Sequence, residues 1–84
     1  MLGDIMKVKN KPVKVLSIFS TDGKIEPVKF VFDDKVVRIE KILKTYEENF
    51  VGNKWLIFTC QHSGSFIYEL KYEIESGIWY FFQK

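Results

Sequence analysis

The segment 66–83 restricts the possible fold more than any other part of the sequence. Over residues 66–75 large apolar side chains alternate with charged ones, and Ile67 alone interrupts the charged set. A period of two is typical of an antiparallel strand with one buried face. Ser76 and Gly77 then form a turn signal, and residues 78–83 follow as a second β-rich run. The segment therefore predicts a β-hairpin close to the C-terminus.

The first half of the chain is divided in the same way. Asp22-Gly23 is the strongest turn signal in the sequence, and it separates the β-rich runs 13–20 and 25–32. Pro27 has no backbone N–H group, so the second run must begin at a sheet edge or at a β-bulge. We expect Val28, Phe30 and Phe32 to face the core, because they alternate with the other side chains of this strand.

The middle of the chain is less clear. β-branched residues dominate the start of segment 36–49, which favours a strand to about Ile42. Residues 43–49 fit either a continued strand or one helical turn. The run 54–61 is a further strand, with apolar residues on both faces.

These segments predict five or six short strands and no helix long enough for a parallel crossover connection. The expected fold is therefore all-β. It is a small antiparallel meander, in the form of an SH3-like barrel or a strongly bent five- to six-stranded sheet, because closure hides the sheet edges and gives a short chain one core.

Length and charge limit the domain organisation. The 84 residues can form only one domain, which we assign to residues 12–84, and the Lys-rich residues 1–11 predict a flexible basic arm. The net charge is +2; four lysines and one aspartate in residues 1–14 give +3, so the remaining seventy residues sum to −1. This balance excludes the strong basic field of a dedicated duplex-binding protein.

A single cysteine, Cys60, excludes an intramolecular disulfide and a cysteine-based zinc cluster. This usage is typical of the reducing cytoplasm, where we expect the protein to reside. Residues 1–11 lack an apolar run of the length that a signal peptide needs, and no stretch approaches the length of a membrane span, so we expect no membrane partner. His62 would share a strand face with Cys60, but we interpret the cysteine as a small buried apolar residue and the histidine as a turn residue.

The sequence offers little material for catalysis. Its paired carboxylates, Asp33-Asp34 and Glu47-Glu48, fall in expected turns or loops, where they would be solvated, and no apolar pocket is evident for either pair. There is no metal-ligand spacing and no glycine-rich phosphate loop. We therefore expect a non-enzymatic protein with no catalytic residue, no metal and no cofactor.

Aromatic and basic residues are interleaved along several predicted strands. This combination is typical of surfaces on which single-stranded nucleic acid stacks. The alternative interpretation is that the aromatic residues form the core, as in most small barrels. The candidate binding surface consists of Arg38, Lys41, Trp55, Lys71, Trp79 and Phe81.

Two stretches, 27–48 and 68–82, carry a resemblance to a known family. The shared features include Pro27 with Phe30, the strand Tyr68-Glu69-Leu70, and a Gly-x-Trp hairpin at Gly77 and Trp79. In these features the chain resembles a family of small bacterial all-β domains of unknown function, often encoded near translesion DNA polymerase components. The resemblance implies an accessory protein close to DNA repair or replication.

We therefore expect a binding or accessory module that docks onto a protein partner, with single-stranded nucleic acid as a second class of ligand. The alternative is a structural homodimer in which strands 54–60 and 78–82 bury their second faces, and an enzyme is the third interpretation. The sequence does not decide whether the five apolar residues 78–82 belong to the core or to an interface. One of two alternating sets must lie across from charged residues: Ile78, Tyr80 and Phe82, or Trp79 and Phe81.

Overall fold

The computed structural model describes residues 11–83, and all of its regular structure is β-strand. The all-β prediction is confirmed, with seven strands instead of five or six. The predicted arm, residues 1–11, lies outside the described part except for Lys11, which begins β1. The strands are β1 (Lys11–Phe19), β2 (Ile25–Phe32), β3 (Lys35–Arg38), β4 (Lys41–Phe50), β5 (Asn53–His62), β6 (Phe66–Glu73) and β7 (Ile78–Gln83).

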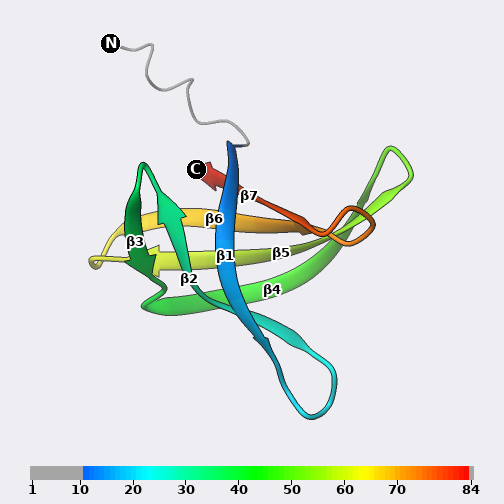
Figure 1. Ribbon diagram of the computed structural model, residues 1–84, viewed down its shortest axis with the longest axis horizontal. Helices are drawn as coiled ribbons and strands as arrows, with labels where there is room; N and C mark the ends of the chain where they lie inside the picture. Colours follow the sequence, from blue (N-terminus) through cyan, green and yellow to red (C-terminus); the bar gives the residue numbers. More distant parts are fainter. Residues whose placement is uncertain (1–10, 84) are drawn as a thin grey trace.

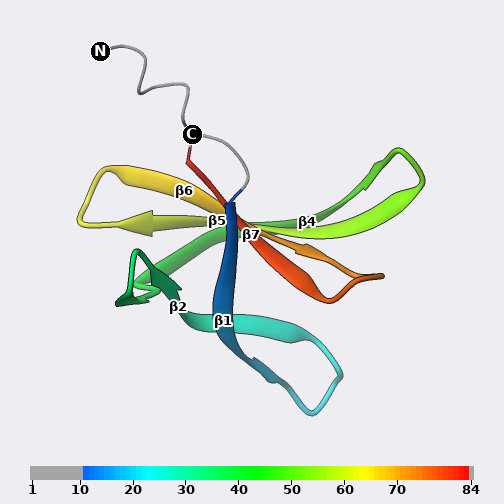
Figure 2. The same cartoon turned by 45° about the horizontal axis from the view of Figure 1, so that its top comes forward.

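The seven strands form one antiparallel sheet in the order β3-β2-β1-β7-β6-β5-β4. The sheet curls into a half-barrel (Figures 1 and 2), and in the view of Figure 1 β1 crosses in front of β5 and β6. β1 and β7 lie side by side although they are at opposite ends of the chain, with Lys11 paired to Phe81 and Val13 paired to Trp79. The two edges of the sheet are β3 and β4.

The ambiguous segment 36–49 is divided between these two edges. β3 ends at Arg38, Ile39 and Glu40 form a corner, and β4 begins at Lys41. The Ile39 N–H donates to the Val28 carbonyl at 3.0 Å, which fixes the corner against β2. Residues 43–49 are extended, because β4 pairs with β5 as far as the β4–β5 turn. The expectation of one continuous strand from 36 to 42 is therefore wrong, and the helical turn at 43–49 is excluded.

Pro27 occupies the β-bulge that its missing N–H predicts. The β1–β2 register shifts between Leu16 and Ser17, where Lys29 and Pro27 are the successive partners and Val28 has no partner in β1. Pro27 itself is buried. The bulge turns the outer part of the β1–β2 hairpin away from the rest of the sheet (Figure 1).

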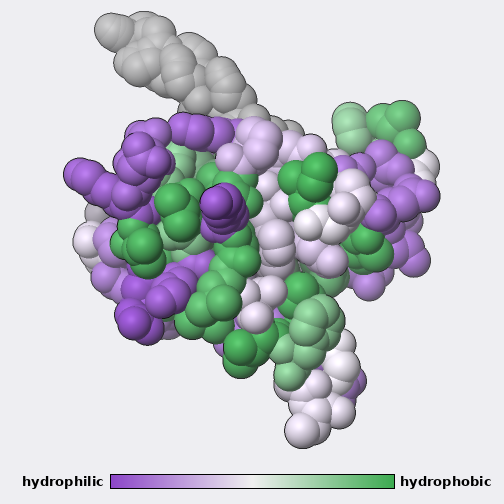
Figure 3. All heavy atoms as spheres, viewed as in Figure 1, coloured by the Kyte–Doolittle hydropathy of each residue, from purple (hydrophilic) through white to green (hydrophobic). Residues whose placement is uncertain are grey.

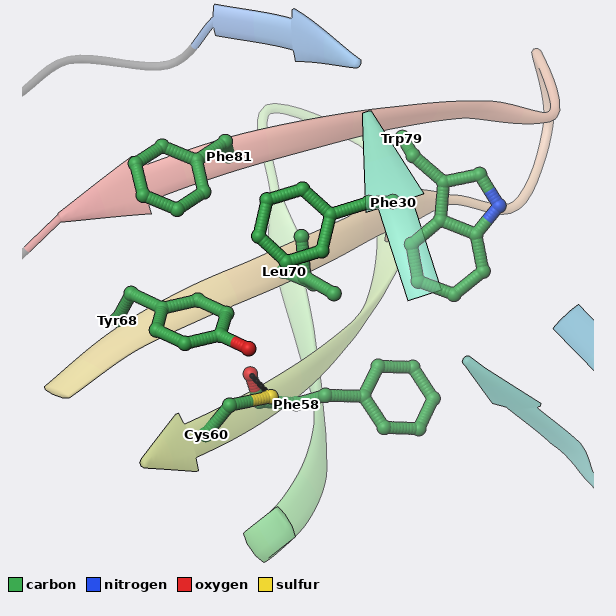
Figure 4. Close-up of a cluster of buried hydrophobic side chains, with 7 residues drawn as sticks. All are labelled: Phe30, Phe58, Cys60, Tyr68, Leu70, Trp79 and Phe81. Atoms are coloured by element: carbon green, nitrogen blue, oxygen red, sulfur yellow. Dashed lines mark hydrogen bonds between the residues drawn. The ribbon is translucent and has the colours of Figure 1, made fainter. Parts of the chain in front are cut away.

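The inner face of the half-barrel carries the hydrophobic core. Phe30 packs on Tyr68 and Phe81 with ring-centroid distances of 5.5 and 5.6 Å, and Trp79 lies 4.8 Å from Tyr72. Large aromatic rings give a short chain much buried apolar area, about 150–250 Å² each. Figure 4 shows the buried cluster, which consists of Phe30, Phe58, Cys60, Tyr68, Leu70, Trp79 and Phe81.

The alternation that predicted the C-terminal hairpin is confirmed. β6 and β7 pair from Tyr68 and Gln83 to Glu73 and Ile78, and Tyr68 and Leu70 are buried. Its ends were predicted less well, since Phe66 and Ile74 are exposed. Among the described residues no helix is present that could cross a membrane.

Candidate functional site

Two of the six residues predicted to form a binding surface belong to the core. Trp79 and Phe81 each expose 7% of their surface, and both point into the aromatic cluster (Figure 4). Their assignment to a binding surface is corrected on this ground. The set that faces outward from β7 is Ile78, Tyr80 and Phe82, which lies across from Glu73, Lys71 and Glu69 of β6.

Arg38 and Lys41 are exposed, but they lie apart from the other candidates. They flank the corner at Ile39 and Glu40 and line a shallow depression that also includes Pro27. Lys41 pairs with Gln61 at one end of the β4–β5 hairpin, and Trp55 lies six positions further towards the other end. At about 3.3 Å per residue this separation is roughly 20 Å.

Trp55 and Lys71 do lie together, on the outer face of the half-barrel. The Trp55 ring is 5.5 Å from the Tyr80 ring, and the Lys71 Nζ atom lies 4.2 Å from the centre of the Phe82 ring. These contacts cover part of the outward set of β7: Lys71 leans over its diagonal neighbour Phe82 on the adjacent strand, and the Trp55 ring reaches across β6 to Tyr80. We name this surface the outer aromatic face; it consists of Tyr46, Phe50, Trp55, Lys71, Tyr80 and Phe82.

A depression of about 280 Å³ lies at one end of the outer aromatic face and is lined by Glu48, Phe50, Trp55, Ile57 and Lys71. Ile57 is 1% exposed and lies at the bottom, whereas Phe50 is 65% exposed. The Trp55 Nε1–H group is buried and has no acceptor among residues 11–83. The depression thus combines an apolar interior with one acidic and one basic residue.

A buried polar network supports this face from β6. Glu69 is 4% exposed and accepts hydrogen bonds from the Tyr46 hydroxyl at 3.1 Å and the Thr59 hydroxyl at 3.4 Å. Partial burial and the neighbouring Glu69 carboxylate raise the pKa of Tyr46 above its ordinary value. The sequence alternation placed Glu69 on a wet face. That expectation is wrong, because β4 extends far enough for Tyr46 to cover it.

The free thiol of Cys60 is fully buried, as the sequence predicted. It donates to the Phe58 carbonyl at 3.5 Å, and the Tyr68 hydroxyl points towards it (Figure 4). Burial raises the pKa of the thiol to about 11, so the group is protonated and unreactive at neutral pH. The His62 Nδ1 atom lies 3.3 Å from Glu40 Oε2. Residues 11–83 contain no cluster of acidic, histidine and cysteine side chains that could hold a metal ion.

Sequence reasoning missed two features of the surface. The first is an open groove of about 730 Å³ between the β1–β2 hairpin and the inner side of β4 and β5, lined by Ile25, Ile42, Leu56 and Phe58 among others. The second is the apolar tip of the β4–β5 hairpin, where Val51 is 82% exposed (Figure 3). The second had a visible signal, since Val51 stands where turns usually carry Asn, Asp or Gly.

Comparisons with known proteins identify no relative of this chain. No protein-family model matches it, and neither a curated protein nor a solved structure shows significant similarity. The resemblance to the small bacterial domains therefore stays a prediction.

Proposed function

We propose that this protein is a non-enzymatic binding module that docks onto a protein partner through the depression on the outer aromatic face. The observation that carries the proposal is the composition of that depression. Its interior is Ile57 with the exposed ring of Phe50 and the half-buried ring of Trp55, and its charged residues, Glu48 and Lys71, are one of each sign. Protein–protein sites typically have an apolar, aromatic centre and a polar rim.

The partner is a protein that inserts an apolar side chain next to Ile57. A protein is favoured over single-stranded nucleic acid for two reasons. The Trp55 and Tyr80 rings are inclined by 54° to each other, which does not form a flat stacking platform. The ammonium group of Lys71 already lies over Phe82 instead of projecting toward a phosphate backbone.

The first test is a Phe50→Ala variant, with Phe19→Ala as its matched control. Both rings are highly exposed, at 65% and 69%, and Phe19 lies on the separate β1–β2 hairpin. Proteins captured from cells that encode the chain would be purified, and their affinity measured by calorimetry. We expect Phe50→Ala to weaken the partner's affinity by at least about tenfold, as for a hot-spot residue, and Phe19→Ala to leave it unchanged.

Thermal unfolding of both variants checks that the fold is intact, and exposed positions should change stability by less than about 0.5 kcal/mol. Equal affinity of the wild type and Phe50→Ala for every captured protein contradicts the proposal. A titration with single-stranded oligonucleotide tests the other ligand class: salt-sensitive quenching of tryptophan fluorescence that is lost in Lys71→Glu would replace the protein partner by nucleic acid.

A cytoplasmic location belongs to the same proposal and rests on the single, unreactive cysteine. The resemblance to domains encoded near translesion polymerase components suggests where to begin. Purified replication and repair proteins are the first candidates for the binding assay.

A further inference from the structure

The free edge of β4 is the longest unpaired strand edge in the described part of the chain. β4 contains ten residues and contacts no strand other than β5, whereas the opposite edge, β3, contains four. An exposed edge of this length presents a row of unpaired backbone N–H and C=O groups to other chains. Proteins usually keep such edges short or cover them, so the edge of β4 requires an occupant.

The β4–β5 turn determines which backbone groups of β4 are free. Phe50 and Asn53 close a two-residue turn, so they direct their backbone groups at each other. By alternation Lys44, Tyr46 and Glu48 also direct theirs at β5. The free groups therefore belong to Thr45, Glu47 and Asn49. A register shift between Ile42 and Lys44 interrupts this pattern, which leaves residues 44–50 as the regular part of the edge.

The charges along this edge are arranged for antiparallel pairing with an identical strand. Lys44 lies near one end of the regular part, Tyr46 follows, and Glu48 lies near the other end, all three on the outer face. If two copies pair antiparallel around Tyr46, Lys44 of each copy lies directly opposite Glu48 of the other. Thr45 then faces Glu47 of the second copy, and these are the residues whose backbone groups are free. Opposite charges directly across a sheet stabilise the pair.

We propose that a second copy of this chain occupies the β4 edge, so that two half-barrels form a symmetric dimer by antiparallel pairing centred on Tyr46. The neighbouring registers are less favourable. Centring on Glu47 sets two carboxylates opposite each other, and centring on Thr45 extends the ladder into the register shift at residue 43. The short edge β3 is a poorer candidate, because its end residues, Lys35 and Arg38, have the same sign of charge.

The first experiment is sedimentation of the purified full chain from low micromolar to several hundred micromolar concentration. We expect a reversible monomer–dimer equilibrium. Thr45→Pro should abolish it, because proline removes an N–H group from the free side of the strand and leaves the bonds to β5 intact. Leu16→Ala, at an exposed position of β1, is the control and should dimerise normally.

The register is tested by exchanging the two charges. Lys44→Glu and Glu48→Lys should each weaken the dimer by about tenfold, because each places like charges opposite each other twice. The double variant Lys44→Glu with Glu48→Lys should restore the affinity. No other antiparallel register pairs these two residues, so restoration identifies the one proposed.

A covalent trap gives an independent reading of the register. Tyr46→Cys should form an intermolecular disulfide under mild oxidation, since the residue lies opposite itself, while Glu47→Cys and Thr45→Cys should not. The native Cys60 does not compete, because it is buried and protonated. Wild-type protein that stays monomeric at all concentrations overturns the proposal, as does preferential cross-linking at position 45 or 47. Phe50→Ala should dimerise normally, because Phe50 lines the docking depression and does not take part in the pairing of residues 44–48.

Discussion

The most unusual single residue is Val51, at the tip of the β4–β5 hairpin. Its φ is 51°, in the left-handed region that β-branched side chains rarely adopt. Ser63 has the same φ in the β5–β6 turn, and Asp33 and Asp34 occupy the β2–β3 turn at positive φ. Polar residues are the ordinary choice there, because they tolerate this conformation. Valine is therefore strained at Val51, and its exposed apolar side chain gains nothing from the fold.

We predict that Val51→Asn stabilises the protein by about 1 kcal/mol, because asparagine suits a type I′ turn. In a domain of this size that gain raises the melting temperature by roughly 4–8 °C. The reciprocal variant, Ser63→Val, has the same φ and should destabilise by a similar amount. Thermal unfolding monitored by circular dichroism measures both. An unchanged or lowered melting temperature for Val51→Asn would show that the turn carries no strain.

The second residue-scale prediction concerns alkaline pH. Burial raises the pKa of Cys60 to about 11 and also raises that of Tyr68. An unfolded thiol has a pKa of about 8.5, so the unfolded chain loses this proton first. The stabilising contribution is complete below about pH 8.5 and is lost as pH rises through the pKa of the folded state. The free energy of unfolding should therefore fall between pH 9 and 11.

Urea unfolding at several pH values measures this effect, and Cys60→Ala is the matched variant. In this variant the free energy of unfolding should fall less steeply with pH over the same interval, because the thiol no longer titrates and its contribution to the raised Tyr68 pKa is also removed. Identical slopes for the two proteins would show that Cys60 ionises as easily in the folded chain as in the unfolded one. The buried thiol should also react slowly with a thiol reagent until the protein unfolds.

At the scale of elements, local patterns predicted most strands but not their junctions. Alternation in 66–75, the Asp22-Gly23 turn and the missing N–H of Pro27 were sufficient because each acts within a few residues. The local pattern of segment 36–49 was not sufficient, because its corner depends on the hydrogen bond from Ile39 to Val28, a residue eleven positions earlier. The break between β3 and β4 is therefore a tertiary effect that local β propensity cannot reveal.

The same limit explains the errors in the candidate site. Trp55 and Lys71 do lie on the outer face. Trp79 and Phe81, however, resemble their neighbours Ile78, Tyr80 and Phe82 in size and polarity. Neither set is polar, so only the register of β7 against β6 and β1 decides which one enters the core. Arg38 and Lys41 were grouped with them by composition alone. Their position follows from the corner, which the sequence did not predict.

At the scale of the molecule, the curled sheet could be expected in outline, because fourteen aromatic residues in 84 need a shared interior. The sequence could not show, however, whether the curled sheet would close into a complete barrel. The half-barrel keeps a groove of about 730 Å³ open beside the core, between the β1–β2 hairpin and β4 with β5. A closed small barrel has no free edges, whereas this one retains two. One of these free edges, β4, is where the proposed dimer would form.

The strand order has a consequence for folding kinetics. Five of the six neighbouring pairs join consecutive strands, and only β1 with β7 joins distant ones. The chain thus consists of two local meanders, β1–β3 and β4–β7, and one loop closure. A circular permutant opened between Ile39 and Glu40, with its natural ends linked, would make every neighbouring pair consecutive. We predict that it refolds faster in stopped-flow experiments, because its mean contact separation is smaller. Equal rates would mean that the β1–β7 contact forms after the slow step, and that the corner at Ile39 and Glu40 does not control the folding rate.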